Sequence, residues 1–185
     1  QEAEDKSRES NVRKAVRLIA RTPAVVAVLE RRRKNLSPIE NEDRPVRSTA
    51  AEFLWMLKGK EAADVEVRML DKYFVLLAEH DFNASTFAAM VTAATTSDIY
   101  SAVISAIGTL KGDLHGSANS RAMESILSIG DVSKVEAYVD DVLNNKKKLM
   151  GFGHRVYKGP DPRADDLRAM ARTLAEANQD QAKWF

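Results

Sequence analysis

The chain has 185 residues, of which 44% are apolar and 30% are charged, and it contains no cysteine. Its 28 basic and 27 acidic residues leave a formal net charge of +1, so no global field directs it to nucleic acid or to a membrane surface. The lack of cysteine excludes a disulfide, a thiolate nucleophile and a sulfur-ligated metal. A polar start without a signal peptide, and no apolar run as long as a membrane span, predict a cytoplasmic globular protein.

The first 47 residues predict helical structure followed by a loop. Helical spacing extends over 8–34, with an interruption at Thr22 and Pro23. Thr22 is suited to cap a second helix there, with Pro23 in its first position. Residues 35–47 contain prolines and many polar side chains, which predict a loop.

Two further helices are predicted before residue 80. The sequence from Thr49 to Glu52 has the form of a capping box, which opens a helix that Gly59 terminates. Residues 62–79 place apolar side chains on one face and charged side chains on the other, which is the pattern of an amphipathic helix.

The stretch 83–111 has an unusual composition for a surface helix. It mixes alanine and serine with large apolar residues, and Asp98 is the only charged residue before Lys111. This pattern predicts one or two buried helices, with a break at Ser97-Asp98. A helix that is apolar all round needs cover on every side. That cover is either another subunit or further polypeptide, or the stretch is the central helix of this domain; the pattern does not choose between these alternatives.

The last third of the chain also reads as helical. A short helix is predicted over 118–129, and a capping box from Ser133 to Glu136 opens another that extends to about Lys148. Asp161-Pro162 begins a final helix, as cap and first position, that extends to about Asn178. Because no alternating strand pattern occurs, we predict an all-α fold.

Glycine is concentrated between residues 108 and 163, where seven of the eight glycines lie. We interpret Gly112 and Gly130 as helix C-caps. The glycines next to histidine or near arginine instead favour loops where the backbone must approach a ligand; these are Gly116, Gly151 and Gly153.

Three histidines are candidates for a site. They lie 35 and 39 residues apart, at His80, His115 and His154, which excludes a local metal-binding spacing and leaves a zinc site assembled in space unsupported. Taken singly, each is more often a structural residue. Together with Arg163, they form a suitable receptor for a small dianion that has a carbonyl between its carboxylates.

Three segments resemble the citrate synthase family in their order and spacing: HDFNASTF at 80–87, KGDLHGSAN at 111–119 and GFGHRVYKGPDPR at 151–163. The resemblance implies a citrate-synthase-like helical fold, with part of the large domain in 1–117 and part of the small domain in 118–185. It also implies a homodimer, or a higher multiple of dimers, and no permanently bound cofactor. The implied reaction condenses acetyl-CoA with oxaloacetate to citrate and CoA through an enol or enolate.

The resemblance also implies roles for individual residues. His115 donates a hydrogen bond to the thioester oxygen, and His154 polarises the oxaloacetate carbonyl. His80 and Arg163 hold the oxygens of oxaloacetate. The implied CoA-binding residues are Leu149, Met150, Gly151, Phe152, Gly153 and Lys158.

The sequence departs from the family pattern in three places. Asp113 stands where proline is expected, and its charge near His115 favours an imidazolium. Ser117 stands where glycine is common. The family's catalytic aspartate lies well downstream of the GHRVY motif, and no matching motif occurs here, so we predict that the chain is part of a longer enzyme and is inactive alone. Two alternatives stay open: a 2-methylcitrate synthase that uses propionyl-CoA, and a non-catalytic helical module that binds CoA or another subunit.

Overall fold

The computed structural model describes residues 2–39, 45–154 and 157–178, so part of the predicted loop at 35–47 lies outside the described residues. The chain divides into two compact units. The middle unit comprises Gln1–Glu4 and Asp81–Gly159, and the flanking unit comprises Asp5–His80 and Pro160–Phe185. Each unit is described below by itself.

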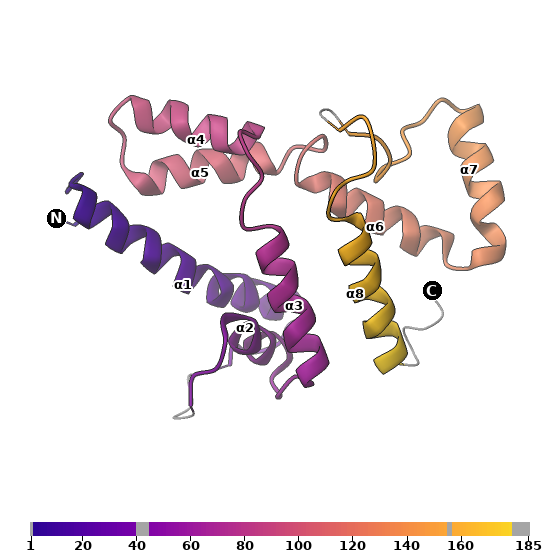
Figure 1. The fold of residues 1–185 in the computed structure, drawn as a ribbon, viewed down its shortest axis with the longest axis horizontal. Helices are drawn as coiled ribbons and strands as arrows, with labels where there is room; N and C mark the ends of the chain where they lie inside the picture. The colour runs from indigo at the N-terminus through magenta and orange to yellow at the C-terminus, as the bar shows by residue number, and fades with distance from the viewer. Residues whose placement is uncertain (1, 40–44, 155–156, 179–185) are drawn as a thin grey trace. The chain divides into compact units, whose positions relative to one another are not determined.

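The flanking unit is built from four helices: α1 (Arg8–Arg33), α2 (Thr49–Lys58), α3 (Asp64–Leu76) and α8 (Ala164–Ala177). Helix α2 packs on both α1 and α3, and α3 also packs on α8 (Figure 1). An ion pair between Lys72 and Asp166 joins α3 to α8, which brings segments about ninety residues apart into contact. The buried apolar residues of this unit are Ala27, Ala50, Ala51, Trp55, Ala62, Met170 and Ala175.

The predicted interruption of the first helix is wrong, because α1 continues through Pro23 as one helix of 26 residues. The Thr22 hydroxyl donates to the carbonyl of Leu18 at 2.6 Å, within the same helix, instead of capping a new one. Proline removes one backbone donor and strains the preceding turn, but packing of the helix against α2 outweighs that local cost.

The N-cap of α2 lies one residue before the predicted one. This cap is Ser48, whose hydroxyl accepts from the Ala51 amide at 3.3 Å, while Glu52 accepts from the Arg47 amide at 3.0 Å. The C-terminal prediction is confirmed: Gly59 adopts the left-handed conformation with φ 73°.

The middle unit contains α4 (Ala84–Ala94), α5 (Ile99–Leu110), α6 (Ser117–Ile129) and α7 (Val135–Asn144). Helices α4 and α5 lie side by side as an antiparallel hairpin (Figure 1). Asn83 caps α4 and Asp98 caps α5, each accepting two amide protons of the first turn. The predicted break at Ser97-Asp98 is therefore confirmed, and Thr96, with φ 62°, makes the turn.

The described residues do not bury this hairpin. Ala102 is its only buried residue, whereas Ile104 is 69% exposed and Ile107 is 60% exposed. Phe87, Met90 and Val91 of α4 are exposed as well. The apolar surface of the hairpin thus lacks cover among the described residues, which agrees with the alternative that another subunit or further polypeptide covers it.

The segment that joins α6 to α7 differs from its prediction. Gly130 ends α6 in the left-handed conformation, as expected, with φ 72°. The predicted capping box at Ser133 is wrong, because Asp131 accepts from both the amide and the hydroxyl of Ser133 and starts a short 3₁₀ turn before α7. Helix α7 then ends at Asn144, short of the predicted Lys148, since Lys146 has a left-handed φ of 53°.

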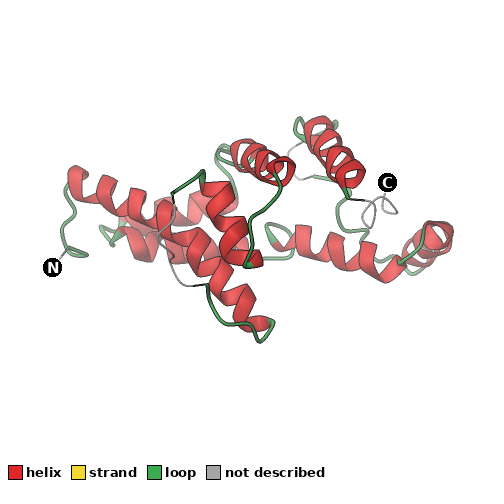
Figure 2. Ribbon diagram, turned by 90° about the horizontal axis from the view of Figure 1, so that it is seen from below, coloured by secondary structure: helices red, strands yellow, loops and turns green. Residues whose placement is uncertain are grey.

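The fold class is confirmed as all-α: the described residues form helices joined by loops, without a strand (Figure 2). Helix α8 begins at Ala164, two residues later than predicted, although Asp161 still accepts from the Arg163 amide at 2.9 Å. Within the described ranges, no helix combines the length and the apolar character that a bilayer crossing requires.

Candidate functional site

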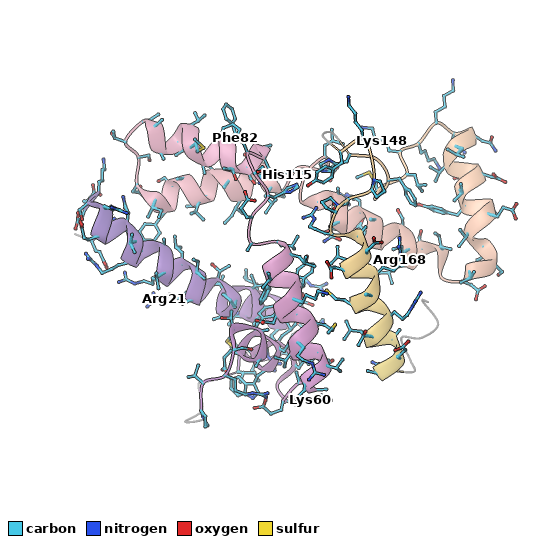
Figure 3. The ribbon with its side chains drawn as sticks, in the orientation of Figure 1. Arg21, Lys60, Phe82, His115, Lys148 and Arg168 are labelled. Carbon is cyan, nitrogen blue, oxygen red and sulfur yellow. The ribbon has the colours of Figure 1, made fainter. Side chains whose placement is uncertain are left out.

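His115 lies in the tight turn between α5 and α6, and it is anchored to the start of α4 (Figure 3). Its Nε2 lies 2.9 Å from the Ser85 hydroxyl oxygen, and the Ser85 amide donates to the same nitrogen at 3.3 Å. Ser85 is itself held by Asn83, whose side-chain oxygen accepts from the Ser85 hydroxyl at 2.6 Å or from its amide at 3.1 Å. The α4 cap and His115 are therefore one connected group.

This arrangement selects the tautomer of His115. A backbone N–H can only donate, so Nε2 acts as an acceptor. The neutral ring then carries its proton on Nδ1, the nitrogen that does not face Ser85. His115 is half-buried, which limits the access of water to the hydrogen bonds of its ring. The turn consequently presents one N–H donor in a fixed direction.

Close packing requires glycine after His115. A Cβ on Gly116 would lie 2.7 Å from the carbonyl oxygen of Leu110, a distance that real Cβ atoms do not adopt. The Ser117 hydroxyl also donates to the Lys111 carbonyl at 2.6 Å, which closes the turn. The backbone of α6 thus begins directly against the end of α5.

The carboxylate of Asp113 is engaged by Arg121. Arg121 Nε donates to Asp113 at 3.1 Å, and its Nη1 donates to Glu124 at 3.0 Å. These hydrogen bonds, first that of Glu124 and then that of Asp113, raise the pKa of Arg121. No hydrogen bond joins Asp113 to His115 in the described structure. The Asp113 carboxylate instead pairs with the Arg121 guanidinium, which offsets its negative charge near His115.

His154 lies in the loop after α7 and is held by a residue of the same loop. The Tyr157 amide donates to His154 Nδ1 at 3.0 Å. The two rings are stacked, with centroids 4.3 Å apart and an interplanar angle of 19°. Because Nδ1 accepts, the neutral ring carries its proton on Nε2, the opposite tautomer to that of His115.

The predicted CoA-binding loop packs on α6 and turns at two glycines. Gly151 and Gly153 have φ values of 89° and 83°, which side chains other than glycine rarely adopt. A Cβ on Gly151 would lie 3.2 Å from that of Ala122. Leu149 and Met150 are half-buried, whereas Phe152 is 76% exposed. The loop therefore presents backbone and one aromatic ring to solvent, with Lys158 exposed further along.

The other two predicted residues, His80 and Arg163, belong to the flanking unit. Arg163 forms a fork with Asp161, at 3.0 Å from Nε and 2.8 Å from Nη2. This pair uses two of the five donors of the guanidinium, so an anion would share Arg163 with a carboxylate. His80 is half-buried in the segment that follows α3 in the sequence, directly before Asp81, which adopts a left-handed φ of 51°.

One open hollow accompanies the His115 turn. Its volume is about 440 Å³, and its lining does not include a histidine. The lining residues are Gly108, Lys111, Gly112, Asp113, Ser117 and Arg121. Over the described part of the chain, no group of three or more His, Asp or Glu residues is arranged to hold a metal ion.

Sequence reasoning identified the histidines but missed the residues that orient them. Ser85 lies inside the motif HDFNASTF, two residues after a helix cap, and that position was the available signal. Tyr157 lies inside GFGHRVYK, where no periodicity singles it out. Asp161 was interpreted only as a cap, yet it also pairs with Arg163.

Comparison with known proteins identifies the family. The family model for the citrate synthase C-terminal domain matches residues 1–185. The chain belongs to the citrate synthase family. It is 46% identical over 185 residues to citrate synthase 2 of Bacillus subtilis, covering all of this chain and 49% of that protein. It is 44% identical over 172 residues to 2-methylcitrate synthase 2 of Corynebacterium glutamicum, covering 90% of this chain and 44% of that protein.

The solved structures of citrate synthases agree with this assignment. The citrate synthase of Thermoplasma acidophilum, in a ternary complex with carboxymethyl coenzyme A and oxaloacetate, matches with a TM-score of 0.87 and 34% identity, covering 96% of this chain and 46% of that one. The citrate synthase of Pyrobaculum aerophilum matches with a TM-score of 0.79 and 40% identity, covering 91% and 41%. The chain spans about half the length of the curated relatives it matches.

Proposed function

We propose that the full-length protein is a citrate synthase, which converts acetyl-CoA, oxaloacetate and water to citrate and CoA. The observation that carries this proposal is the orientation of two motif histidines by backbone amides: His115 by Ser85 and His154 by Tyr157. Each neutral ring then offers one N–H donor in a defined direction. A Claisen-type condensation needs two such donors, because negative charge develops on two different carbonyl oxygens.

The first donor acts during enolisation of acetyl-CoA. A base removes a proton from the acetyl methyl group, and charge moves onto the thioester oxygen. His115 Nδ1–H donates to that oxygen, and the bond strengthens as the enolate forms. In the family the base is an aspartate, and no matching motif occurs in this chain. We therefore expect the 185-residue chain alone to be inactive.

The second donor acts on oxaloacetate. His154 Nε2–H donates to its carbonyl oxygen, so the carbonyl carbon becomes a better electrophile for the enol carbon of acetyl-CoA. Arg163 and His80 bind carboxylate oxygens of oxaloacetate, with Asp161 holding the arginine fork in place. Water then cleaves the citryl thioester, so no covalent bond to the enzyme is needed.

The segment from Leu149 to Gly153 binds CoA in this proposal. Its left-handed glycines expose backbone groups, which can pair with the polar edge of adenine, and Lys158 is exposed and can reach a phosphate. The thioester is a substrate, and the proposal includes no resident cofactor. The assignment of 1–117 to a partial large domain and 118–185 to a partial small domain, like the cytoplasmic location, remains a prediction from the sequence.

A second candidate is a 2-methylcitrate synthase that uses propionyl-CoA. The similarity to the Corynebacterium glutamicum 2-methylcitrate synthase favours it, since the identity is close to that of the citrate synthases. The acyl groups of the two substrates, acetyl and propionyl, differ by one methylene, and a pocket discriminates one methylene by about 10- to 200-fold in kcat/KM. The ratio of kcat/KM values for acetyl-CoA and propionyl-CoA decides between them.

The α4–α5 hairpin supports a homodimer. Neither helix contains a charged residue, and the exposed face carries Ile104, Ile107 and Phe87. Light scattering across a dilution series measures the association. Ile104→Glu is expected to weaken it, whereas Leu143→Glu, on the similarly exposed Leu143 of α7, serves as the matched control. A stable monomer at every concentration would contradict the proposal.

The function itself is tested by thiol release from acetyl-CoA with oxaloacetate. We expect the full-length protein to release CoA and the purified 185-residue chain not to do so. The short chain has no match to the family's catalytic aspartate, and a general base typically accelerates such a step by about 10²- to 10⁴-fold. Binding of CoA without turnover by the full-length protein would instead support the non-catalytic module. Full activity of the short chain would contradict the proposal that the catalytic base lies outside these 185 residues.

A further inference from the structure

Tyr157 contacts His154 through two different parts of its structure. Its amide donates to Nδ1 at 3.0 Å, and its ring stacks on the imidazole with centroids 4.3 Å apart. A single hydrogen bond locates one ring nitrogen but lets the ring tilt about it. A parallel aromatic contact restricts that tilt, so the two contacts together define both the position and the plane of His154.

The two residues directly before His154 are a glycine and an exposed phenylalanine. Gly153 has no side chain and a left-handed φ of 83°, and Phe152 is 76% exposed. His154 is itself exposed, whereas Tyr157 is half-buried. The better-anchored ring therefore supports the more exposed one, rather than the reverse.

The plane of an imidazole sets the direction of its remaining N–H. A hydrogen bond prefers a donor angle above about 150° and weakens steeply below about 120°, so a large tilt of the ring reduces polarisation of an acceptor. Mere packing would stabilise the loop without this directional effect. The contact thus has a consequence for chemistry wherever His154 Nε2 serves as a donor.

We propose that Tyr157 is a positioning residue, whose ring holds the imidazole plane of His154 so that Nε2–H points at the carbonyl oxygen of a bound 2-oxo dicarboxylate. This inference rests on the proposed function, because it assumes that His154 polarises such a carbonyl. It adds a residue and a property, the ring face of Tyr157, that the histidine motif alone does not specify. The phenol hydroxyl has no part in it.

The test combines two spectroscopic measurements on the full-length protein. The first records the proton resonances of His154, assigned with His154→Gln, since a stacked aromatic ring shifts them whether or not substrate binds. The second records the infrared carbonyl stretch of oxaloacetate labelled with ¹³C at the keto carbon. Polarisation by a well-aligned donor lowers that frequency. The variants are Tyr157→Leu and Tyr157→Phe, with Tyr138→Leu as a control on the half-buried tyrosine of α7.

We expect Tyr157→Leu to shift the His154 resonances and to return the carbonyl stretch toward that of free oxaloacetate. Its kcat should fall by about 3- to 10-fold, with a smaller change in the oxaloacetate KM, because alignment matters most in the transition state. Tyr157→Phe keeps the aromatic ring, so it should retain the wild-type His154 resonances, carbonyl stretch and kcat. Tyr138→Leu should also leave these three quantities unchanged. Tyr157→Met replaces the leucine variant if thermal unfolding shows that the latter does not fold.

The outcomes separate this inference from the proposed function. A wild-type protein that does not perturb the oxaloacetate carbonyl overturns the proposed function, and the inference with it. A perturbed wild-type carbonyl that is the same in Tyr157→Leu overturns the positioning role alone. Equal losses in the leucine and phenylalanine variants also overturn it, since they would assign the effect to the hydroxyl.

Discussion

The turn that carries His115 and the loop that carries His154 solve the same problem in different ways. Each imidazole accepts from one backbone amide, but the amide at His115 comes from Ser85, thirty residues earlier, and the amide at His154 comes from Tyr157 in the same loop. Different nitrogens accept, so the remaining donors are Nδ1–H and Nε2–H respectively. The first orientation depends on the packing of α4 against α5, whereas the second comes from an amide of the same loop.

The strongest test of this comparison removes the His115 donor. In the full-length protein, His115→Ala is expected to lower kcat by about 10²- to 10³-fold, the usual cost of losing one oxyanion donor. The oxaloacetate KM should change little, because the bond forms to the thioester oxygen. Steady-state kinetics with each substrate varied in turn measure both. An unchanged kcat with a raised oxaloacetate KM would contradict the role of His115 as donor to the thioester oxygen. The glycines next to it would then have only a structural role.

The next effect concerns the flanking unit, where binding rather than turnover is expected to respond. Arg163→Leu removes a charge-assisted bond to a carboxylate that is present throughout the reaction, so the oxaloacetate KM should rise by about 10- to 150-fold. Arg168→Leu is the matched control, since Arg168 lies in α8, the helix that Arg163 immediately precedes, and pairs with Asp165 at the surface. Equal effects of the two substitutions would show that Arg163 acts only through the stability of α8.

A smaller effect tests the anchor of His115. Ser85→Ala removes the hydroxyl but keeps the amide, so kcat should fall by about 2- to 13-fold, the value of one hydrogen bond. Ser101→Ala is the control, because the Ser101 hydroxyl donates to the α5 cap, Asp98, as the Ser85 hydroxyl donates to Asn83. A loss of turnover in Ser101→Ala as large as that in Ser85→Ala would mean that the hairpin, and not the His115 contact, is responsible.

The smallest effect sharpens the comparison of the two caps. Hydrogen bonds from the Ser101 side chain and amide lower the pKa of Asp98 below 3.8, so its carboxylate stabilises α5 above that pH and this contribution is lost as the pH falls through the lowered pKa. Asn83, the α4 cap, does not titrate. Asp98→Asn should therefore flatten the acid loss of stability, measured by urea unfolding from pH 6 to pH 2 on the full-length protein. Asp140→Asn, on the exposed Asp140 of α7, is the control, and an equal change there would contradict the assignment.

The sequence predicted the fold class and most helix ends, because these depend on local patterns. The break at Ser97-Asp98 and the left-handed caps Gly59 and Gly130 agree with the structure. The helix interruption predicted at Pro23 is wrong, because tertiary packing overrides a local helix breaker. The start of α7 was predicted wrongly because Asp131 competes with Ser133 for the capping position. Such competition involves differences of about 1 kcal/mol, which residue order alone does not rank.

The candidate site divides in the same way. Residue order alone identifies the histidines, the glycine-rich turns around them and the order of the motifs, because these are properties of neighbouring residues. Only the tertiary structure decided that Ser85 orients His115, that Arg121 engages Asp113 and that α3 meets α8 through Lys72. A hydrogen bond across thirty residues forms only when helix packing brings its donor and acceptor within 3.5 Å, and that separation is a property of the fold rather than of the local sequence.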